Sequence, residues 1–365
     1  MIIKNRQAKG YTMENFDEYL RQGEPKKAEK AKVWKTAIGL QQVDGLKPSD
    51  YLIETAKQNI EGDITIDEVK ERIDRYYQQH PTKTKEDRTE EADKVSARIA
   101  EMLGEQTFTF SPAEYLSIHR RLFQGIYNFA GKIRDYNITK KEWVLNGETV
   151  FYASADSLKA TLEYDFEQER KFSYKGLSEQ EIIEHIAHFI SYLWQIHIFG
   201  EGNTRTTAIF LIKYLRKLGF KNVNNDLFAE NSYYFRNALV RANYEDLSKG
   251  IHKTEKYLFR FLSNLLLKEN HLLKNREMHV QYADLVNTQN DPVKAENDLV
   301  NTQNDPVKAN ILQQLRQNPK ANYAQLAEKT GYSAATIKRH IQELKKSAII
   351  ERIGSDKKGY WKIIE

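Results

Sequence analysis

Cysteine is absent from the 365-residue chain. A disulfide framework, a thiolate nucleophile and a cysteine-based zinc site are therefore excluded. Long apolar runs are missing as well, since none approaches the roughly 18 residues that a membrane helix requires. The first ten residues, MIIKNRQAKG, lack the apolar core of a secretory signal peptide. These absences predict a cytoplasmic protein with no membrane partner.

The composition is that of a folded protein, with 40% hydrophobic and 29% charged residues. The length predicts two or three domains. The net charge of +5 is spread unevenly, because residues 308–365 hold twelve Lys or Arg against five Asp or Glu, a local charge of +7. The basic character therefore belongs to the C-terminal end, where it indicates a nucleic-acid partner.

The strongest candidate for a functional site lies in residues 194–216, WQIHIFGEGNTRTTAIFLIKYLR. An apolar helical run ends near Trp194, and helical spacing resumes from Ile209 after a short loop. Two glycines and an asparagine precede the second helix, and Thr204 and Thr206 are good capping residues. The loop should therefore aim backbone N–H groups and the positive end of a helix dipole at one point, which makes an anion site.

Three side chains around this anion site supply further chemistry. His197 is a base, Glu201 is a carboxylate that can hold a metal, and Arg205 is a permanent cation. A base, a metal ligand, an amide cradle and an arginine are the parts that a phosphoryl- or nucleotidyl-transfer site needs. A purely structural histidine at the loop entrance is the less favoured interpretation of His197.

The nine residues HIFGEGNTR resemble the core motif of the Fic (filamentation-induced by cAMP) family, whose pattern is H-P-F-x-[D/E]-G-N-G-R-x-x-R. Ile198 stands in place of the proline, Thr204 of the second glycine and Ala208 of the last arginine. In the family that arginine contacts the outermost phosphate of ATP, so the resemblance leaves open how the nucleotide's tail is held here. The matching residues are His197, Phe199, Glu201, Gly202, Asn203 and Arg205.

The resemblance implies a protein adenylyltransferase, which moves AMP from ATP to a Ser, Thr or Tyr hydroxyl of a target protein or of itself. His197 would take the proton from the attacking hydroxyl, and Glu201 would hold Mg²⁺ on the phosphates. Gly202 and Asn203 would cradle the α-phosphate, and Arg205 would offset charge on the leaving pyrophosphate. The residues implied to bind ATP or its phosphates are Phe199, Gly200, Gly202, Asn203, Thr204 and Arg205.

Residues 34–80 resemble the small antitoxin-like helical segment that precedes some Fic domains. There, a helix with the pattern [S/T]-x-x-x-E-[G/N] lies beside the ATP site, and its glutamate pairs with the motif's last arginine and blocks productive binding. In this chain Leu40 replaces Ser/Thr, Asp44 replaces the glutamate and Gly45 is retained. Because Ala208 replaces the arginine, we expect retained architecture with an altered or lost brake. A helical extension that only packs on the core is an equal alternative.

A single β-hairpin is expected in residues 141–153, KEWVLNGETVFYA. Asn146-Gly147 between β-branched and aromatic residues is the strongest short hairpin signal. A target segment could pair with such a hairpin by strand addition and present its hydroxyl to the site. The Fic family has a flap at this place in the order. The alternative is a hairpin that only covers the core.

Other candidates carry weaker signals. Tyr233, Tyr234 and Arg236 resemble the stretch that closes the nucleoside side of the Fic pocket, although core packing explains the aromatic residues at this spacing equally well. His185 and His188 lie one turn apart on a helix and could form a metal pair, but their apolar neighbours favour packing. Arg134 is expected in a surface salt bridge.

The last part of the chain resembles a winged helix-turn-helix regulator. It follows two copies of DLVNTQNDPVKA, fourteen residues apart, which indicate a spacer. Residues 309–365 predict three helical segments and two strands around a Gly/Lys tip. Protein contacts or dimerisation are the alternative to DNA binding, so a homodimer stays open. The side chains expected at the DNA are Ser333, Thr336, Lys338 and Arg339.

The predicted fold is therefore mainly α: a Fic-type helical bundle with a β-hairpin flap, followed by a small winged-helix domain. Its expected segments are a flexible lead-in at 1–33, the antitoxin-like segment at 34–80, a charged linker at 80–93, the Fic catalytic domain at 94–275, a linker at 276–308 and the winged helix-turn-helix at 309–365.

Three rivals to AMP transfer remain open. The motif could transfer another nucleotide or a phosphate-linked group, and Ala208 makes this less remote. The chain could be a DNA-binding regulator with a degenerate Fic site, or a protein that only docks a partner. The intact His197, Glu201, Asn203 and Arg205 argue against a dead site.

Overall fold

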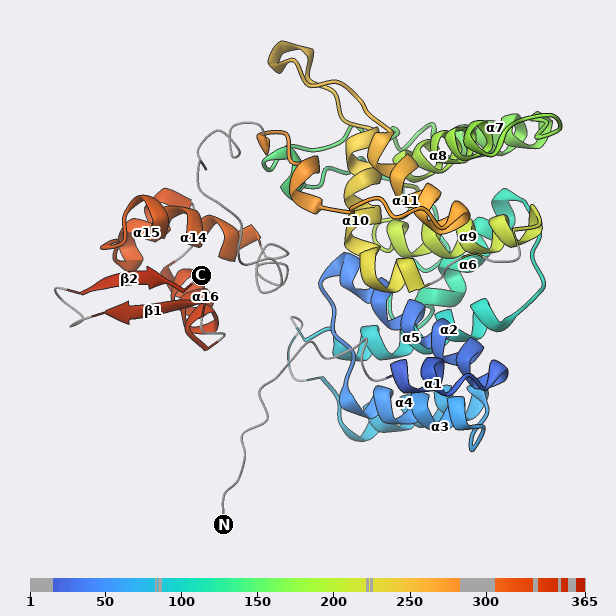
Figure 1. The fold of residues 1–365 in the computed structure, drawn as a ribbon, viewed down its shortest axis with the longest axis horizontal. Coiled ribbons are helices and arrows are strands. Elements are labelled where there is room, and N and C mark those ends of the chain that lie inside the picture. Colours follow the sequence, from blue (N-terminus) through green and yellow to red (C-terminus); the bar gives the residue numbers. More distant parts are fainter. Residues whose placement is uncertain are drawn as a thin grey trace. The chain divides into compact units, whose positions relative to one another are not determined.

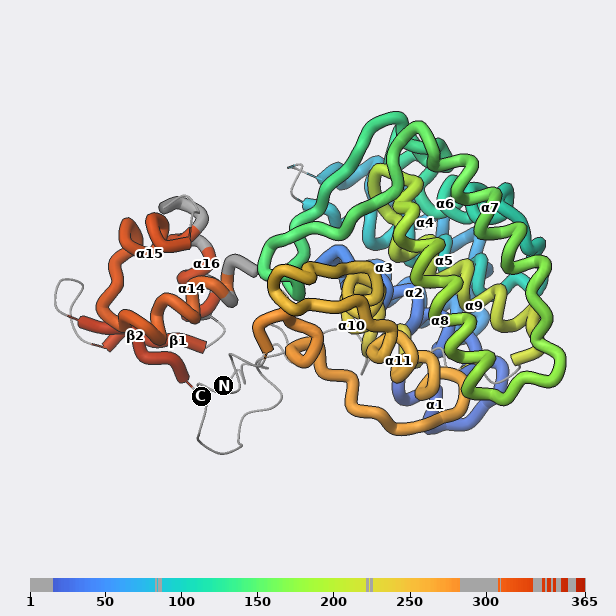
Figure 2. The backbone as a smooth tube through the Cα atoms, turned by 90° about the horizontal axis from the view of Figure 1, so that it is seen from above, coloured from blue at the N-terminus to red at the C-terminus, as the bar shows by residue number. Residues whose placement is uncertain are grey.

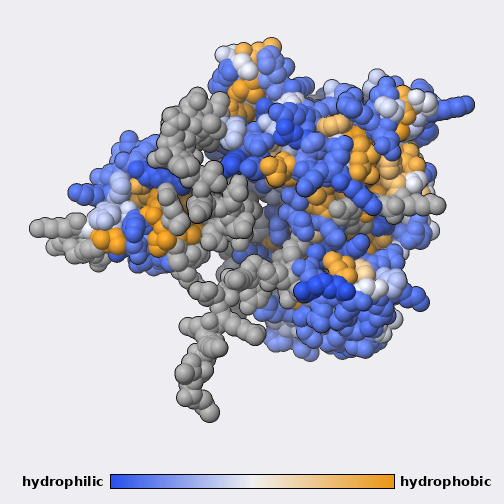
Figure 3. All heavy atoms as spheres, in the orientation of Figure 1, coloured by the Kyte–Doolittle hydropathy of each residue, from blue (hydrophilic) through white to orange (hydrophobic). Residues whose placement is uncertain are grey.

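The computed structural model divides the chain into two compact units, residues 1–283 and residues 284–365 (Figure 1). It describes residues 16–82, 84, 87–220, 223, 226–282, 306–330, 334–346, 349–353 and 359–364. Helices dominate both units, which confirms the mainly α fold, and the two strands found in these residues form one sheet. Hydrophilic side chains cover most of the face drawn in Figure 3, with hydrophobic ones in separate patches. Within the described part of the chain, none of the helices has the length and apolar character that crossing a membrane demands.

The first unit is a helical bundle (Figure 2). Its N-terminal half consists of α1 (Asp17–Gln22), α2 (Pro25–Gly39), the 3₁₀ helix η1 (Leu40–Asp44), α3 (Asp50–Glu61), α4 (Ile66–Gln79), α5 (Thr89–Gly104) and α6 (Pro112–Phe123). There follow η2 (Trp143–Leu145), α7 (Leu158–Lys171), α8 (Glu179–Ile196), α9 (Asn203–Lys217), α10 (Asp226–Ala242), η3 (Leu247–Lys249), α11 (Lys256–Leu267) and η4 (Asn275–Met278).

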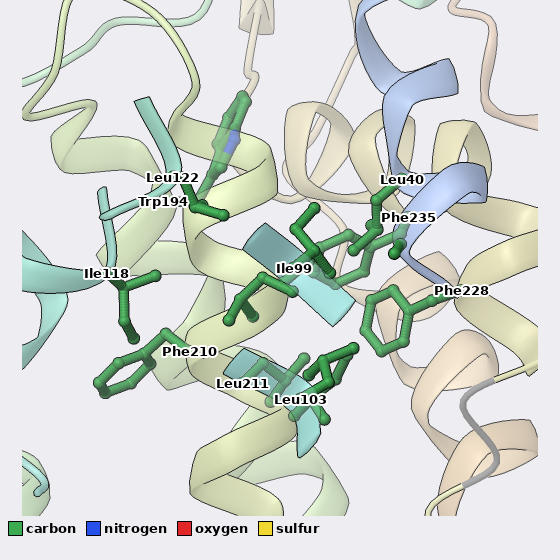
Figure 4. Packing of buried hydrophobic residues seen from close by; sticks show 14 of the residues in the cluster. Leu40, Ile99, Leu103, Ile118, Leu122, Trp194, Phe210, Leu211, Phe228 and Phe235 are labelled. Carbon is green, nitrogen blue, oxygen red and sulfur yellow. The ribbon is translucent and has the colours of Figure 1, made fainter. Parts of the chain in front are cut away.

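Helix α9 is the buried centre of this bundle. All residues from Asn203 to Leu215 are buried, and α9 contacts α5, α6, α8 and η1. Figure 4 shows Phe210 and Leu211 of α9 packed among side chains that include Leu103 of α5. A helix that is enclosed on all sides has its N-terminal end fixed by the surrounding helices, so the loop before α9 has a rigid base.

Helix α8, which leads into that loop, starts with a capping box. The Ser178 hydroxyl accepts from the Glu181 N–H, and the Glu181 carboxylate accepts from the Ser178 N–H in return. The two orphan donors at this helix end are thereby satisfied. The capping box fixes the residue at which α8 begins, and this helps to set the position of the loop that follows the last turn of α8.

Helices α2 and α10 approach each other very closely at Gly39. A Cβ at this position would lie 2.4 Å from the carbonyl oxygen of Ala229, so only glycine fits. The Ser232 hydroxyl donates to the Gly39 carbonyl at 2.7 Å and adds a polar tie at the same point. This contact fixes η1, which begins at the next residue and carries Asp44 toward α9.

Two segments predicted as loose or linking are helical. Residues 17–33 form α1 and most of α2, because Phe16 and Ala31 are fully buried in the core. Helix α5 begins at Thr89, inside the predicted charged linker. Two acidic side chains of its first turns are buried rather than solvated, since Glu91 binds arginines and Asp93 accepts from Ser49 and Tyr77. A charged sequence cannot reveal partners that come from elsewhere in the chain.

The predicted hairpin of residues 141–153 is not formed by paired strands. Trp143–Leu145 make one 3₁₀ turn, and Asn146 and Gly147 follow with φ of 57° and 88°. The turn itself is closed as expected, because the Glu142 N–H donates to the Glu148 carbonyl at 2.9 Å. Since Val144 and Leu145 are adjacent and both buried, the alternation that a strand needs is broken. The flap is thus an ordered turn without paired strands.

The second unit contains α14 (Pro306–Gln317), α15 (Tyr323–Thr330), α16 (Ala334–Lys346), β1 (Ile350–Ile353) and β2 (Tyr360–Ile363). The strands pair antiparallel, with Ile350 opposite Ile363. Side chains from all three helices and both strands share one core, and the Trp361 indole donates to the Ala321 carbonyl at 3.2 Å. The three helices and the paired strands are those predicted from the sequence. The duplicated DLVNTQNDPVKA segments fall almost entirely outside the described residues.

Candidate functional site

The loop between α8 and α9 is tightly bent. His197 ends α8 with a φ of 49°, in the left-handed region that non-glycine residues rarely adopt. Gly202 precedes α9 with a φ of 79°, and a Cβ there would lie 2.4 Å from the Phe123 ring. A Cβ at Gly200 would lie 2.6 Å from the Tyr136 hydroxyl. Gly202 is therefore required, whereas the exposed Tyr136 side chain could move away from a larger residue at position 200. The strained backbone at His197 is typical of a functional position.

Asn203 closes this loop. Its Nδ2 donates to the Phe199 carbonyl at 2.8 Å, and its Oδ1 accepts from the Phe199 N–H at 3.0 Å. The side-chain amide of Asn203 therefore holds the loop. The resemblance implied instead that Asn203 contacts the α-phosphate. Phe199 is fully buried, with its ring stacked on His119 at 3.6 Å between centroids, so it too supports the loop. Thr204 accepts from the Trp194 indole at 3.0 Å.

His119 of α6 is a second clamp, which the sequence did not indicate. Its Nδ1 accepts from the Gly131 N–H at 2.8 Å, so the proton sits on Nε2, which donates to the Glu201 carbonyl at 2.9 Å. Burial lowers the pKa of His119 to about 4, and the bond to Glu201 offsets only part of this effect. The neutral ring thus fixes the backbone at Glu201. A histidine within an amphipathic helix carries no pattern that would reveal this role.

Arg134 is a third clamp, and the expected surface salt bridge is wrong. The side chain is buried, and its Nε donates to the His197 carbonyl at 2.8 Å. Its terminal nitrogens donate to the carbonyls of Tyr136, Ala153 and Ile196. A guanidinium has five donors, so it can satisfy the orphan carbonyls where α8 ends. The reason lies in the tertiary structure, which brings these carbonyls together.

The imidazole of His197 is held without hydrogen bonds among the described residues. Both ring nitrogens are buried and unpartnered, and the ring packs on Tyr152 at 4.1 Å between centroids. Burial, followed by the charges of Lys140 and Arg236, lowers the pKa of His197 well below its ordinary value. The ring is therefore neutral at physiological pH and has a free nitrogen that can accept a proton.

Arg205 lies behind the loop and not in front of it. Its side chain has no exposed surface, and it stacks over the Phe123 ring at 4.7 Å. Its Nη2 lies 2.7 Å from Glu91 and 2.8 Å from Asp44, while Nη1 donates to Gln41 at 3.0 Å. The Asp44 contact has ion-pair distance without hydrogen-bond alignment. Arg205 therefore holds η1 against α9, which differs from the direct phosphate contact that the resemblance implied.

A pocket opens in front of the loop and encloses about 250 Å³ of empty space, including its mouth. Both of its lining cations are in ion pairs, Lys140 with Glu201 at 3.1 Å and Arg236 with Glu142 at 2.7 Å. Because the 250 Å³ includes open solvent at the mouth, the enclosed space is smaller still, so a nucleotide requires the pocket to widen. The lining residues are Asp44, Lys140, Trp194, His197, Glu201, Asn203, Thr204 and Arg236.

The expected site residues are therefore divided between two roles. His197, Glu201, Asn203 and Thr204 reach the pocket wall. Phe199 and Arg205 support the loop from behind. No sequence motif indicated Lys140, which lines the pocket. Arg236, expected with Tyr233 and Tyr234 at the nucleoside side, also lines it.

Glu201 is the residue that could hold a divalent cation. The Lys140 ammonium lies 3.2 and 3.1 Å from its two oxygens, so the carboxylate already accepts a cation facing the pocket. No group of three or more His, Asp or Glu side chains gathers as a metal cluster in the described residues. One carboxylate suits Mg²⁺, because this ion takes further oxygens from phosphates and water.

Tyr233 and Tyr234 are not among the residues that line the pocket. Tyr234 is buried, with its ring 6.5 Å from that of Phe261, and Tyr233 is half-buried beside Asn237. Core packing accounts for both, so the expected nucleoside contacts are not supported by their placement.

The histidine pair of α8 does not form a metal site in the described residues. His185 Nε2 lies 2.6 Å from Glu169, and His188 Nδ1 lies 2.9 Å from Glu255. Because each ring binds a different carboxylate, the two side chains are drawn apart. His185 is partly exposed and His188 is exposed, which fits the alternative of packed or partly exposed histidines.

The expected DNA contacts can be placed only in part. Lys338 is exposed on α16, the second helix of the helix-turn-helix. Ser333 lies outside the described residues, as do the side chains of Thr336 and Arg339. An exposed lysine on this helix is compatible with a phosphate contact.

Comparisons with known proteins agree with this geometry. A family model described as Fic/DOC family matches residues 109–215, and one described as winged helix-turn-helix DNA-binding matches residues 305–351. The chain is 28% identical over 103 residues to the protein adenylyltransferase VbhT of Bartonella schoenbuchensis, covering 28% of this chain and 20% of that protein. It is 28% identical over 137 residues to the probable protein adenylyltransferase y4lH of Sinorhizobium fredii, covering 37% of this chain and 67% of that protein.

Among solved structures, the chain is similar to a Fic family protein from Desulfovibrio desulfuricans G20. The TM-score is 0.42 and the sequence identity is 10%, with coverage of 99% of this chain and 98% of that chain.

The His119 clamp makes a prediction about stability and pH. Because the folded state lowers the pKa of His119 to about 4, its contribution is complete above an unfolded pKa of about 6.5 and is lost as pH falls toward 4. The wild type should lose about 3 kcal/mol more unfolding free energy than His119→Gln between pH 7 and pH 4. Urea titrations of both proteins across this range measure the difference. Parallel pH profiles would contradict it.

Proposed function

Since residues 109–215 form a Fic domain and residues 305–351 a winged helix-turn-helix, we propose that this protein transfers AMP from ATP to a hydroxyl group of a protein target, itself included. The observation that carries the proposal is the imidazole of His197. It is neutral, unpartnered among the described residues, and lines a pocket with the carboxylates of Asp44 and Glu201 and the cations of Lys140 and Arg236. A base, a cation ligand and positive charge in one pocket are what this reaction requires.

In the proposed reaction His197 takes the proton from a Ser, Thr or Tyr hydroxyl of the target. The hydroxyl oxygen forms a bond to the α-phosphorus of ATP, and the bond from this phosphorus to its leaving oxygen breaks. Pyrophosphate departs, and AMP remains on the target as a phosphodiester. Histidine suits the task because it returns to its neutral form near pH 7. The left-handed backbone conformation of His197 sets the direction of its ring at the start of the loop.

The start of α9 supplies a site for the phosphates. The first backbone N–H groups of this helix have no acceptor within the helix, and the dipole is positive at this end. Asn203 and Thr204, the first residues of α9, line the pocket. The clamps at Phe199, Glu201 and His197 keep these donors fixed, so little reorganisation is needed when negative charge develops.

Glu201 would hold Mg²⁺ on the phosphate oxygens. A bound divalent cation there would neutralise charge on the leaving pyrophosphate. The hard carboxylate and its placement at the pocket wall fit this role.

We further propose that Asp44 restrains the site. It lines the pocket and pairs with Arg205, whereas Ala208 leaves no arginine at the motif's last position. The inhibitory contact of Asp44 would thus be kept, with Arg205 as its partner in place of an arginine at the motif's last position. Because Asp44 narrows a pocket that is already small, displacing it would open room for the nucleotide.

A second function is favoured by one observation in the C-terminal unit. The match to a DNA-binding winged helix-turn-helix coincides with the local charge of +7. We propose that this unit binds DNA, with α16 facing the duplex.

The first prediction tests His197. Incubation with α-labelled ATP and Mg²⁺ should label the wild-type protein, and His197→Ala should reduce labelling by about two to four orders of magnitude, as expected for loss of a general base. His188→Ala is the matched control, since this histidine is exposed on α8. Equal labelling of His197→Ala and wild type would reject the base. Label from γ-labelled ATP would indicate phosphate transfer.

The second prediction tests Asp44. Asp44→Asn keeps the size of the side chain but removes its charge, so labelling should rise at least about fivefold, a coupling of roughly 1 kcal/mol. Arg205 retains Glu91 and Gln41 as partners, so the fold should persist. Asp63→Asn, at an exposed position, removes the same charge and should leave the rate unchanged. Unchanged labelling by Asp44→Asn would mean that Asp44 only packs η1.

The third prediction tests DNA binding by fluorescence anisotropy of the full-length chain with a duplex. Affinity should fall steeply with salt, and Lys338→Ala should lower the slope of log K against log salt by about one. Lys132→Ala removes the same charge from an exposed site of the first unit and should leave the slope as it is. Binding that is absent at low salt would favour protein contacts for this unit.

A further inference from the structure

Lys140 occupies both oxygens of the carboxylate that faces the pocket. Its ammonium lies 3.2 Å from Oε1 and 3.1 Å from Oε2 of Glu201, although the two residues are 61 positions apart. The backbone beneath it is fixed, because the Lys140 N–H donates to the Thr149 hydroxyl at 3.1 Å. A single cation centred on both oxygens of a carboxylate occupies the place that a chelated divalent cation would take.

The neighbouring charges are committed elsewhere. Both terminal nitrogens of Arg236 pair with Glu142, which is fully buried. Arg205 is enclosed by Asp44 and Glu91. Breaking either arrangement would leave a buried charge uncompensated, which is expensive. These two arginines are therefore poorly placed to turn toward an incoming anion.

Lys140 differs from both arginines. In the described residues its ammonium is paired with Glu201 alone, and the side chain keeps 23% of its surface exposed. The Glu201 side chain is 36% exposed. Separating two partly hydrated groups costs little, and a lysine has a long flexible stem on which the ammonium can move. The Lys140–Glu201 pair is thus the part of the pocket that can open at low cost.

We propose that Lys140 is a mobile internal cation: it competes with divalent metal for Glu201, and once displaced it binds the polyphosphate chain of the nucleotide. This inference rests on the proposed function for the identity of the nucleotide. Each charged group keeps a partner of opposite charge in this exchange, because the metal binds the Glu201 carboxylate while the Lys140 ammonium moves to a phosphate oxygen. Lys140 then supplies a positive charge for the phosphates that Ala208, in place of the motif's last arginine, does not. Its role is that of a positioning and selectivity residue.

The exchange predicts effects of opposite sign on the two ligands. Lys140→Met removes the competing charge while keeping the length of the stem, so Glu201 should bind Mn²⁺ at least about tenfold more tightly in the absence of nucleotide. The same variant should bind inorganic pyrophosphate about tenfold more weakly when Mn²⁺ is saturating, because one charge-assisted contact is lost. A lysine that only stabilised the fold would weaken both.

Free Mn²⁺ measured by electron paramagnetic resonance and pyrophosphate binding measured by calorimetry give the two readouts. Lys141→Met is the matched control, since this exposed neighbour removes the same charge and should match the wild type in both. Lys140→Arg should keep the competition with metal. Glu201→Gln should abolish the Mn²⁺ binding in every background.

Unchanged or weaker Mn²⁺ binding by Lys140→Met, or no Mn²⁺ binding by either protein, overturns the proposal. Tighter Mn²⁺ binding with unchanged pyrophosphate affinity overturns the part of the proposal in which Lys140 binds the polyphosphate chain. Neither readout needs AMP transfer. A chain that fails to label any protein but shows both shifts would reject the proposed function and support this exchange.

Discussion

The closure of the loop between α8 and α9 is the constraint on which the pocket depends. The Asn203 side chain binds both the N–H and the carbonyl of Phe199. His119 binds the carbonyl of Glu201, and Arg134 binds that of His197. These bonds all act on backbone atoms, so the functional side chains are left free to face the pocket. The buried α9 is the rigid base that makes such positioning accurate.

The charged side chains of the site are arranged in ion pairs. Three cations at or behind the pocket have acidic partners: Lys140 has Glu201, Arg236 has Glu142, and Arg205 has Glu91 together with Asp44. Of these pairs, only Lys140–Glu201 is substantially exposed on both sides. A highly charged ligand must exchange partners to enter, and the cheapest exchange is at the exposed pair. The small pocket volume and the paired charges therefore describe the same closed state.

Much of the fold could be predicted because its signals are local. Helical periodicity and capping residues predicted the bundle, and the Gly-rich loop before α9 lies where the motif placed it. The turn at Asn146-Gly147 formed as expected, but the strands of the hairpin did not, because Val144 and Leu145 are adjacent and both buried in the core. Residues 17–33 were missed for a related reason, since their burial depends on distant helices.

The sequence by itself determined which chemistry is present: the order of His197, Glu201 and Asn203 on a loop between two helices is a local property of the chain. Only the tertiary structure decided the direction in which each group faces. It turned Arg205 away from the pocket and toward Asp44 and Glu91, and it brought Lys140 to Glu201 from 61 positions away. The physical reason is that a charge is positioned by its partners, and here the partners come from segments far apart in the chain.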